Sequence, residues 1–250
     1  MIRALLFDIG GTLVGDPRKA AWSELRLGGL GGRLDGLASR GLIDALERAD
    51  AELDSPEYSH FLGEPAVVKR ALESIAVEGE PALVEELVVA YRRAAVRVLA
   101  EHEELRPLHS TELAATLSDL RVSGATKLGI ISNERRWAPQ IYLAQVLGID
   151  PSAFDAILTS DECGFGKPDP RIFQLGAARL GVALSEAAYV GDSIERDVIP
   201  ALALGMTAIW FTGLVGDAFP NQPAGSRSIG DIRDLPAIVR EANATSQPPP

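Results

Sequence analysis

The sequence predicts an α/β protein: a parallel sheet with helices on both faces, and an all-helical segment inserted after the first strand. One observation is that apolar runs of strand length alternate with helical segments from about residue 107 onwards, which is typical of parallel sheets. Another is that residues 16–106 contain apolar residues at helical spacing only. The apolar run Ile2–Phe7 precedes this segment, so the helices interrupt the sheet after its first strand.

Five short apolar runs have the length of buried strands. They are Ile2–Phe7, Lys127–Ile131, Phe154–Leu158, Ala188–Val190 and Met206–Phe211, and we expect the last to be the final core strand. The segments between and after them predict helices at residues 110–122, Pro139–Leu147, Pro170–Leu180, Ile194–Leu204 and Asp231–Ala242. Three of these helices are followed directly by a glycine, as many helix C-termini are.

The inserted segment shows three helical stripes of apolar residues, over Leu37–Leu53, Val67–Ile75 and Leu83–Val98. The sequence therefore predicts an α/β core formed by residues 1–14 and 107–242, a helical cap at 15–106 and a disordered tail at 243–250. The expected hinges of the cap are the glycine-rich stretch Gly28–Gly32 and the segment near Arg106 and Pro107. A helical subdomain with no role in access to a site has the same pattern.

Composition narrows the classes of partner. The formal net charge of −11 disfavours non-specific binding to nucleic acid or to anionic membranes, so we expect neither as a partner. Cys163 is the single cysteine, so no disulfide can form within the chain. Because the sequence enters a core strand at once, we expect no signal peptide. These features favour the cytoplasm. No feature of the sequence predicts an oligomeric state.

Polar residues follow three of the predicted strands. Because the carboxyl ends of parallel strands meet at one edge of a sheet, we expect these side chains to lie close together. A lysine also stands in a loop between glycine and proline, upstream of the fourth predicted strand. Each residue alone has a bland explanation, such as a turn cap or a solvated loop lysine. The residues are Asp8, Ser132, Asn133, Lys167, Asp192 and Asp197.

In this order, the strand-end Asp, strand-end Ser, loop Lys and strand-end Asp resemble the four motifs of the haloacid dehalogenase superfamily. The resemblance covers these motifs, their spacing and the surrounding core. It implies a Rossmann-like fold, and the helical insertion is similar to the cap of the largest subgroup.

Phosphoryl transfer to a carboxylate needs a nucleophile and positive charge around the transferred oxygens. The resemblance assigns the nucleophile to Asp8 and a hydrogen bond to the phosphoryl oxygens to Ser132. Lys167 would neutralise negative charge there, and Asp197 would orient Lys167 or a metal-bound water. These four are the expected catalytic residues.

Carboxylates at two strand ends also suit a divalent cation. We expect Mg²⁺ to bind Asp8 and Asp192, and the resemblance adds the backbone carbonyl of Gly10 as a third ligand. The expected substrate-binding groups are the backbone amides of Gly11 and Thr12 and the side chain of Asn133.

Position 10 departs from the family pattern. Phosphatases of the superfamily carry there a second Asp, which protonates the leaving alcohol and then activates water, and Gly10 can do neither. Loss of a general acid/base typically costs on the order of 10²–10⁴-fold. The sequence thus predicts weak or altered hydrolysis of unactivated phosphomonoesters, unless another group, such as Asp16, fills the role.

Taken together, the residues favour a Mg²⁺-dependent, phosphatase-type hydrolase that acts on a small phosphorylated metabolite. A non-catalytic protein that binds a phosphometabolite or a protein partner is one alternative. The others are a 2-haloacid dehalogenase and a phosphonate hydrolase. A phosphonate hydrolase would need a cap lysine, for which Lys19 and Lys69 are the choices. The leading Asp192 favours the phosphatase because the dehalogenases usually lack it.

Overall fold

A computed structural model describes most of the chain and divides it into two compact units. One unit is Met1–Gly15 with Glu104–Pro250, and the other is Asp16–Glu103. The expected hinge Gly28–Gly32, Lys19 and residues 246–250 of the expected tail lie outside the described residues. The described ranges are 1–17, 20–22, 24–25, 36–37, 40–53, 63–214 and 221–245.

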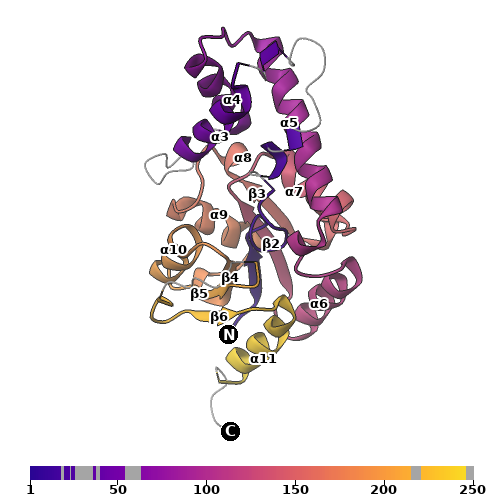
Figure 1. Ribbon diagram of the computed structural model, residues 1–250. Coiled ribbons are helices and arrows are strands. Elements are labelled where there is room, and N and C mark those ends of the chain that lie inside the picture. Colours follow the sequence, from indigo (N-terminus) through magenta and orange to yellow (C-terminus); the bar gives the residue numbers. More distant parts are fainter. Residues whose placement is uncertain are drawn as a thin grey trace. The chain divides into compact units, whose positions relative to one another are not determined.

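The larger unit is built on a six-stranded parallel sheet in the order β3-β2-β1-β4-β5-β6 (Figure 1). This confirms the predicted α/β fold with a Rossmann-like parallel core. The strands are β1 (Ala4–Phe7), β2 (Lys127–Ser132), β3 (Ala156–Thr159), β4 (Ala187–Gly191), β5 (Thr207–Phe211) and β6 (Arg227–Ile229).

The sheet ends on an edge strand that the sequence did not predict. We expected Met206–Phe211 to be the final strand, but β6 pairs in parallel with it. Only Ile229 of its three residues is buried. A single buried residue gives no alternating pattern, so the sequence holds no signal for this strand.

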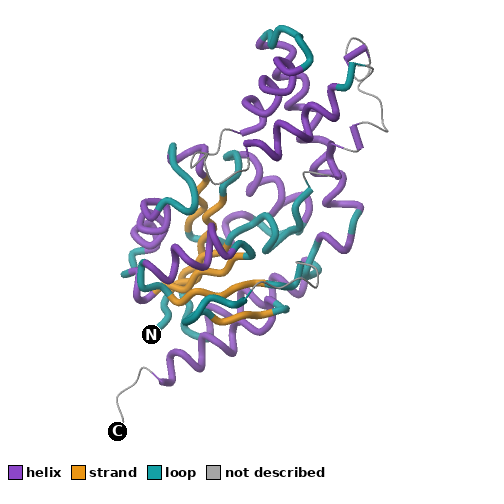
Figure 2. Tube along the Cα trace, turned by 60° about the vertical axis from the view of Figure 1, so that its left-hand side comes forward, coloured by secondary structure: helices purple, strands orange, loops and turns teal. Residues whose placement is uncertain are grey.

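Helices cover both faces of the sheet, as Figure 2 shows. Alternate residues of β1 point to opposite faces, and Leu6 packs with α9 (Pro170–Leu180) and α10 (Ile199–Ala203) in one apolar cluster. On the other face, α6 (Ser110–Val122) contacts β2, and α11 (Leu235–Thr245) contacts α6. The short helices α7 (Trp137–Ile141) and α8 (Ser160–Cys163) follow β2 and β3.

Two of the predicted helices contain a π-helical turn. The expected helix at Ile194–Leu204 begins as a π turn over Ile194–Val198 and continues as α10. Pro200 has no N–H to donate back into that turn, so the usual α-helical bond cannot form there. The expected helix at Pro139–Leu147 likewise combines α7 with a π turn over Tyr142–Val146.

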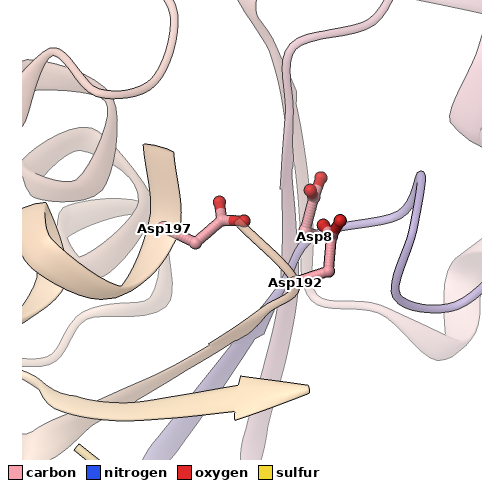
Figure 3. A group of neighbouring side chains, drawn as sticks. All are labelled: Asp8, Asp192 and Asp197. Carbon is pink, nitrogen blue, oxygen red and sulfur yellow. The ribbon is translucent and has the colours of Figure 1, made fainter. Parts of the chain in front are cut away.

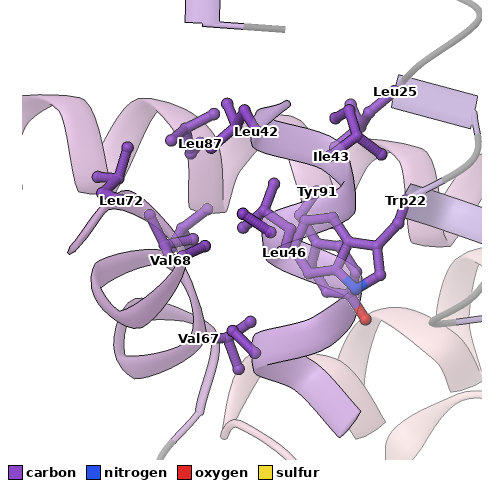
Figure 4. Packing of buried hydrophobic residues seen from close by; sticks show 14 of the residues in the cluster. Trp22, Leu25, Leu42, Ile43, Leu46, Val67, Val68, Leu72, Leu87 and Tyr91 are labelled. Carbon is purple, nitrogen blue, oxygen red and sulfur yellow. The ribbon is translucent and has the colours of Figure 1, made fainter. Parts of the chain in front are cut away.

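The smaller unit is helical wherever it has regular structure in the described residues. It contains α3 (Leu42–Leu53), α4 (Gly63–Ser74) and α5 (Pro81–Glu101). Figure 4 shows its own apolar core, in which Leu46 and Val68 are fully buried. The rings of Trp22 and Tyr91 lie with their centroids 4.2 Å apart in the same cluster. Of the helices that the structure describes, none combines the length and the apolar character that a membrane span requires.

Candidate active site

The strand register brings the predicted motif residues to one edge of the sheet. Phe7 is aligned with Ile130 of β2 and with Val190 of β4. Asp8 therefore leaves β1 between its two neighbouring strands, at the level where Ser132 and Asp192 follow them. Figure 3 shows the carboxyl groups of Asp8 and Asp192 beside each other, with Asp197 reaching toward them from the following helix.

Lys167 joins two of these carboxylates. Its Nζ lies 2.9 Å from Asp8 Oδ1 and 2.6 Å from Asp197 Oδ1, and its side chain is 2% exposed. Burial lowers the pKa of Lys167, but attraction by Asp197 and Asp8 outweighs burial and holds the pKa above its usual value. Lys167 therefore stays a cation inside the protein.

Asp197 is fully buried and both of its oxygens have partners. Oδ1 accepts from Lys167 Nζ, and Oδ2 accepts from the backbone N–H of Ser193 at 3.0 Å. Gly191 packs directly against this carboxyl group, so any side chain at position 191 would collide with it. Asp197 is therefore fixed by its surroundings and in turn fixes the ammonium group of Lys167.

Asn133 is engaged by the backbone of the lysine loop. The N–H of Lys167 donates to Asn133 Oδ1, and Asn133 Nδ2 donates to the carbonyl of Lys167, both at 2.7 Å. We expected Asn133 to bind substrate directly. In the structure both ends of its amide hold Lys167 in place, which is a positioning role.

The turn after Asp8 also uses groups that we had assigned to the substrate. The N–H of Gly11 donates to the carbonyl of Val14 at 2.6 Å, and that of Thr12 to the carbonyl of Ile9 at 3.3 Å. Both amides therefore donate within the turn, and their binding to a substrate stays a prediction. Gly11 has φ of 79° and lies against Asp192, where a Cβ would overlap the carboxylate.

Buried hydroxyl groups at this edge lack a hydrogen-bond partner among the described residues. They include Thr12 Oγ1 and Ser132 Oγ, whose residues are fully buried, and Ser160 Oγ directly after β3. Orphaned buried hydroxyls are costly unless a ligand or a water satisfies them. The hydroxyl of Thr12 is therefore available to a phosphoryl oxygen, together with the hydroxyl of Ser132.

The carboxyl groups are crowded enough to resist ionisation. Burial raises the pKa of Asp8 to about 6, with Lys167 opposing and Asp197 adding to the shift. Burial raises the pKa of Asp192 to about 7, and repulsion by Asp8 and Asp197 adds to that shift. Oxygens of these three carboxylates lie within 4.8 Å of one another.

Three carboxylates facing one ammonium leave an excess of negative charge at the sheet edge. Hard oxygen donors at this separation suit a divalent cation such as Mg²⁺. Because Asp197 is fully used by Lys167 and Ser193, the oxygens of Asp8 and Asp192 are the better ligands. The donor set therefore fits the expected metal.

Sequence reasoning missed one positioning group. Trp210 Nε1 donates to the backbone carbonyl of Asp192 at 2.8 Å. Trp210 is paired in register with Gly191 on the neighbouring strand. The tryptophan near the end of the predicted strand Met206–Phe211 was the available signal. It could be linked to Asp192 only once the two strands were known to be neighbours in the sheet.

Comparisons with known proteins agree with this arrangement. A model of the haloacid dehalogenase-like hydrolase family matches residues 2–205. The chain is 31% identical to a glyceraldehyde 3-phosphate phosphatase of Methanopyrus kandleri over 254 residues, covering 96% of this chain and 98% of the relative.

Solved structures share the fold. A haloacid dehalogenase (HAD) phosphatase of Thermococcus onnurineus has a TM-score of 0.62 at 24% identity and covers 95% of this chain and 98% of its own. A 2-haloacid dehalogenase of Pseudomonas syringae has a TM-score of 0.64 at 23% identity, covering 97% and 100%. Since a phosphatase and a dehalogenase match equally well, this likeness shows the fold alone.

Proposed function

The chain belongs to the haloacid dehalogenase-like hydrolase family, and on that premise we propose that it is a Mg²⁺-dependent phosphatase of small phosphorylated metabolites. The observation that carries the proposal is the placement of Lys167 between Asp8 and Asp197, with Asp192 at the next strand end. A buried cation next to a strand-end carboxylate suits the transfer of a dianionic group to that carboxylate.

Asp8 is the nucleophile in this proposal. One of its carboxylate oxygens bonds to phosphorus while the bond from phosphorus to the leaving oxygen breaks, which gives an acyl phosphate on Asp8. Lys167 lies against Asp8 Oδ1 and neutralises charge on the phosphoryl oxygens. The unpaired hydroxyls of Ser132 and Thr12 donate to those oxygens.

Asp8 and Asp192 are the side chains that would hold Mg²⁺, with the backbone carbonyl of Gly10 as a further ligand. When bound, the metal would neutralise phosphoryl charge. Asp197 keeps Lys167 in position and does not take part in bond making.

Position 10 alters the expected chemistry. Gly10 has no side chain that can move a proton, so hydrolysis of an alkyl phosphate depends on a group elsewhere. Aryl and acyl phosphates depend on it less, because their leaving groups are stable without a proton. We therefore expect this enzyme to differ from its relatives most clearly on alkyl phosphates.

The test is turnover of p-nitrophenyl phosphate with Mg²⁺ and with EDTA. We expect the wild type to turn over the substrate with Mg²⁺ but not with EDTA, and we expect Asp8→Asn to be inactive in both. Asp119→Asn on the exposed face of α6 is the matched control and should keep full activity. Binding of a phosphometabolite without turnover would favour the non-catalytic alternative, and metal-independent release of halide from a 2-haloacid would favour a dehalogenase.

We also propose that residues 15–106 act as a cap over the site. The segment follows Asp8 directly in the sequence, and closing a cap excludes water from a reactive acyl phosphate. Cleavage by protease within residues 14–34 should slow when Mg²⁺ and vanadate are added together. An unchanged cleavage rate would count against the cap.

A further inference from the structure

Position 10 has room for a side chain. Gly10 does not have a positive φ, so an L-residue fits its backbone. A Cβ built on Gly10 meets one heavy atom within 4 Å among the described residues other than its chain neighbours. That atom is Glu134 Oε1, at 3.9 Å. The carboxylate of Glu134 therefore lies beside the space that a side chain at position 10 would enter.

The distance is short enough for one carboxylate to serve in place of the other. An aspartate at position 10 would hold its carboxylate oxygens about 2.4 Å from its Cβ, from standard bond lengths. Glu134 Oε1 lies about 1.5 Å beyond that radius, by the same geometry. Glu134, in the loop that follows β2, thus brings an acidic oxygen to the neighbourhood that the missing Asp would occupy.

The segment that carries Glu134 is anchored on both sides. On one side, Asn133 exchanges two hydrogen bonds of 2.7 Å with the backbone of Lys167. On the other, Arg135 Nη1 lies 2.8 Å from Asp161 Oδ1, and the N–H of Arg136 donates to Asp161 Oδ2. A group that transfers protons needs a backbone held in this way.

The other ionisable groups at this edge are committed elsewhere. Lys167 is a buried cation shared by Asp8 and Asp197, and both oxygens of Asp197 have partners. Asp8 is the nucleophile, and Asp192 is the proposed metal ligand. Among the described residues, the carboxylate that lies next to position 10 is that of Glu134.

We propose that Glu134 is the general acid/base of this enzyme, replacing the carboxylate that Gly10 lacks. The proposal rests on the proposed phosphatase function. As Asp8 Oδ bonds to phosphorus and the ester P–O bond breaks, the Glu134 carboxyl gives its proton to the leaving alkoxide, which departs as an alcohol. The carboxylate of Glu134 then takes a proton from water as that oxygen attacks phosphorus, so hydrogen phosphate leaves and Asp8 is restored.

The experiment compares an alkyl and an aryl phosphate, glycerol 3-phosphate and p-nitrophenyl phosphate, in four proteins: wild type, Glu134→Gln, Gly10→Asp with Glu134→Gln, and Glu162→Gln. Glu134→Gln should lower kcat/KM for the alkyl phosphate by about 10²-fold, within the usual range for a general acid. Formation of p-nitrophenol in the first turnover should change less than about threefold. Glu162→Gln, on exposed α8, is the matched control and should leave both substrates unchanged.

Two further readouts separate catalysis from structure. In Glu134→Gln the acyl phosphate should accumulate, visible as a burst of p-nitrophenol and as a protein mass increased by one phosphoryl group. Gly10→Asp restores a carboxylate in the Glu134→Gln background. The double variant should therefore hydrolyse the alkyl phosphate at least tenfold faster than Glu134→Gln. A structural role for Glu134 would produce neither effect.

Other results would overturn the proposal. Equal losses on both substrates in Glu134→Gln, with a lowered Tm, would show that Glu134 only supports the fold. Unchanged alkyl-phosphate turnover would exclude it as the acid, with Asp16→Asn as the next variant. A wild type that hydrolyses only the aryl phosphate would also exclude Glu134 as the acid. In that case, loss of aryl-phosphate activity in Asp8→Asn would still support the proposed phosphatase function.

Discussion

Lys167 controls the charge balance at the level of single residues. An isolated lysine buried this deeply would tend to lose its proton, but Asp8 and Asp197 at 2.9 and 2.6 Å hold it charged. The same contacts offset part of the cost of burying two carboxylates. Among the described residues no cation is paired directly with Asp192, and burial with repulsion by Asp8 raises its pKa to about 7. Residue-scale predictions therefore concern Asp192 and the group that positions Lys167.

Asp192→Asn should stabilise the metal-free protein at high pH. The pKa of Asp192 in the fold, about 7, lies above its ordinary value of 3.8, so between these values the folded state binds more protons than the unfolded state. Stability from this group is fully present below about pH 4 and is lost as pH rises through about 7. Thermal melts in EDTA should show a higher Tm for the variant at pH 8 and nearly equal values at pH 4.

Added Mg²⁺ should reverse the order of Tm between the wild type and Asp192→Asn at pH 8. The wild type should gain in Tm because the cation replaces the missing positive charge, whereas the variant should gain little. A variant that melts below the wild type at pH 8 in EDTA would contradict the repulsion argument.

Asn133 should matter for catalysis through Lys167. Asn133→Ala removes both hydrogen bonds to the lysine backbone, so the ammonium loses its fixed position and kcat should fall at least tenfold with little change in KM. Asn133→Asp keeps the acceptor for the Lys167 N–H but loses the donor. Its kcat should lie between those of the wild type and Asn133→Ala. Steady-state kinetics on p-nitrophenyl phosphate measure this. A raised KM with unchanged kcat would instead indicate direct substrate contact.

At the scale of elements, the strand order connects β5 to the metal-ligating end of β4. Trp210 of β5 lies opposite Gly191 and holds the backbone of Asp192 through its indole N–H. Neighbouring strands thus fix Asp8 and Asp192 relative to each other without any side-chain bond between them.

Trp210→Phe should therefore weaken metal binding without removing a ligand. A neutral hydrogen bond contributes about 0.5–1.5 kcal/mol, so the Kd for Mg²⁺ should rise about two- to thirteen-fold. Calorimetric titration of the variant measures the change, and Trp137→Phe on α7 is the matched control. An unaltered Kd for Trp210→Phe would mean that the indole hydrogen bond does not position Asp192.

The elements of the core were largely predictable because β1 to β5 are apolar runs of strand length, and polar motif residues mark the ends of β1, β2 and β4. Local features that depend on one or two residues were not predictable: β6 has a single buried residue, and the π turn at Ile194–Val198 depends on Pro200 directly after it. The sheet edge that gathers the site followed from parallel topology alone.

At the scale of the whole molecule, the candidate site shows where sequence reasoning ends. Asp8, Lys167 and Asp197 come together as their motifs predict. Chain order does not show which polar groups bond to one another within the fold. In the structure the amides of Gly11 and Thr12 donate within their turn, and Asn133 bonds to the backbone of Lys167. Their contact with a substrate stays a prediction. Glu134 next to position 10 becomes visible only in three dimensions.

The two units have separate apolar cores, and this should govern how the molecule unfolds. Leu46 is fully buried within the helical unit, whereas Leu158 is buried within the cluster of the sheet unit. A leucine-to-alanine change in a packed core costs about 2–5 kcal/mol. Because domains with their own cores unfold as units, each loss should be confined to one of them.

Hydrogen exchange followed by mass spectrometry measures this directly. Leu46→Ala should speed exchange in α3, α4 and α5 while protection of β1, β2 and β4 stays as in the wild type. Leu158→Ala is the matched variant and should give the reverse pattern. If either change lowers protection across both units equally, the chain unfolds as one cooperative body, and the helical segment cannot open independently of the sheet that carries Asp8.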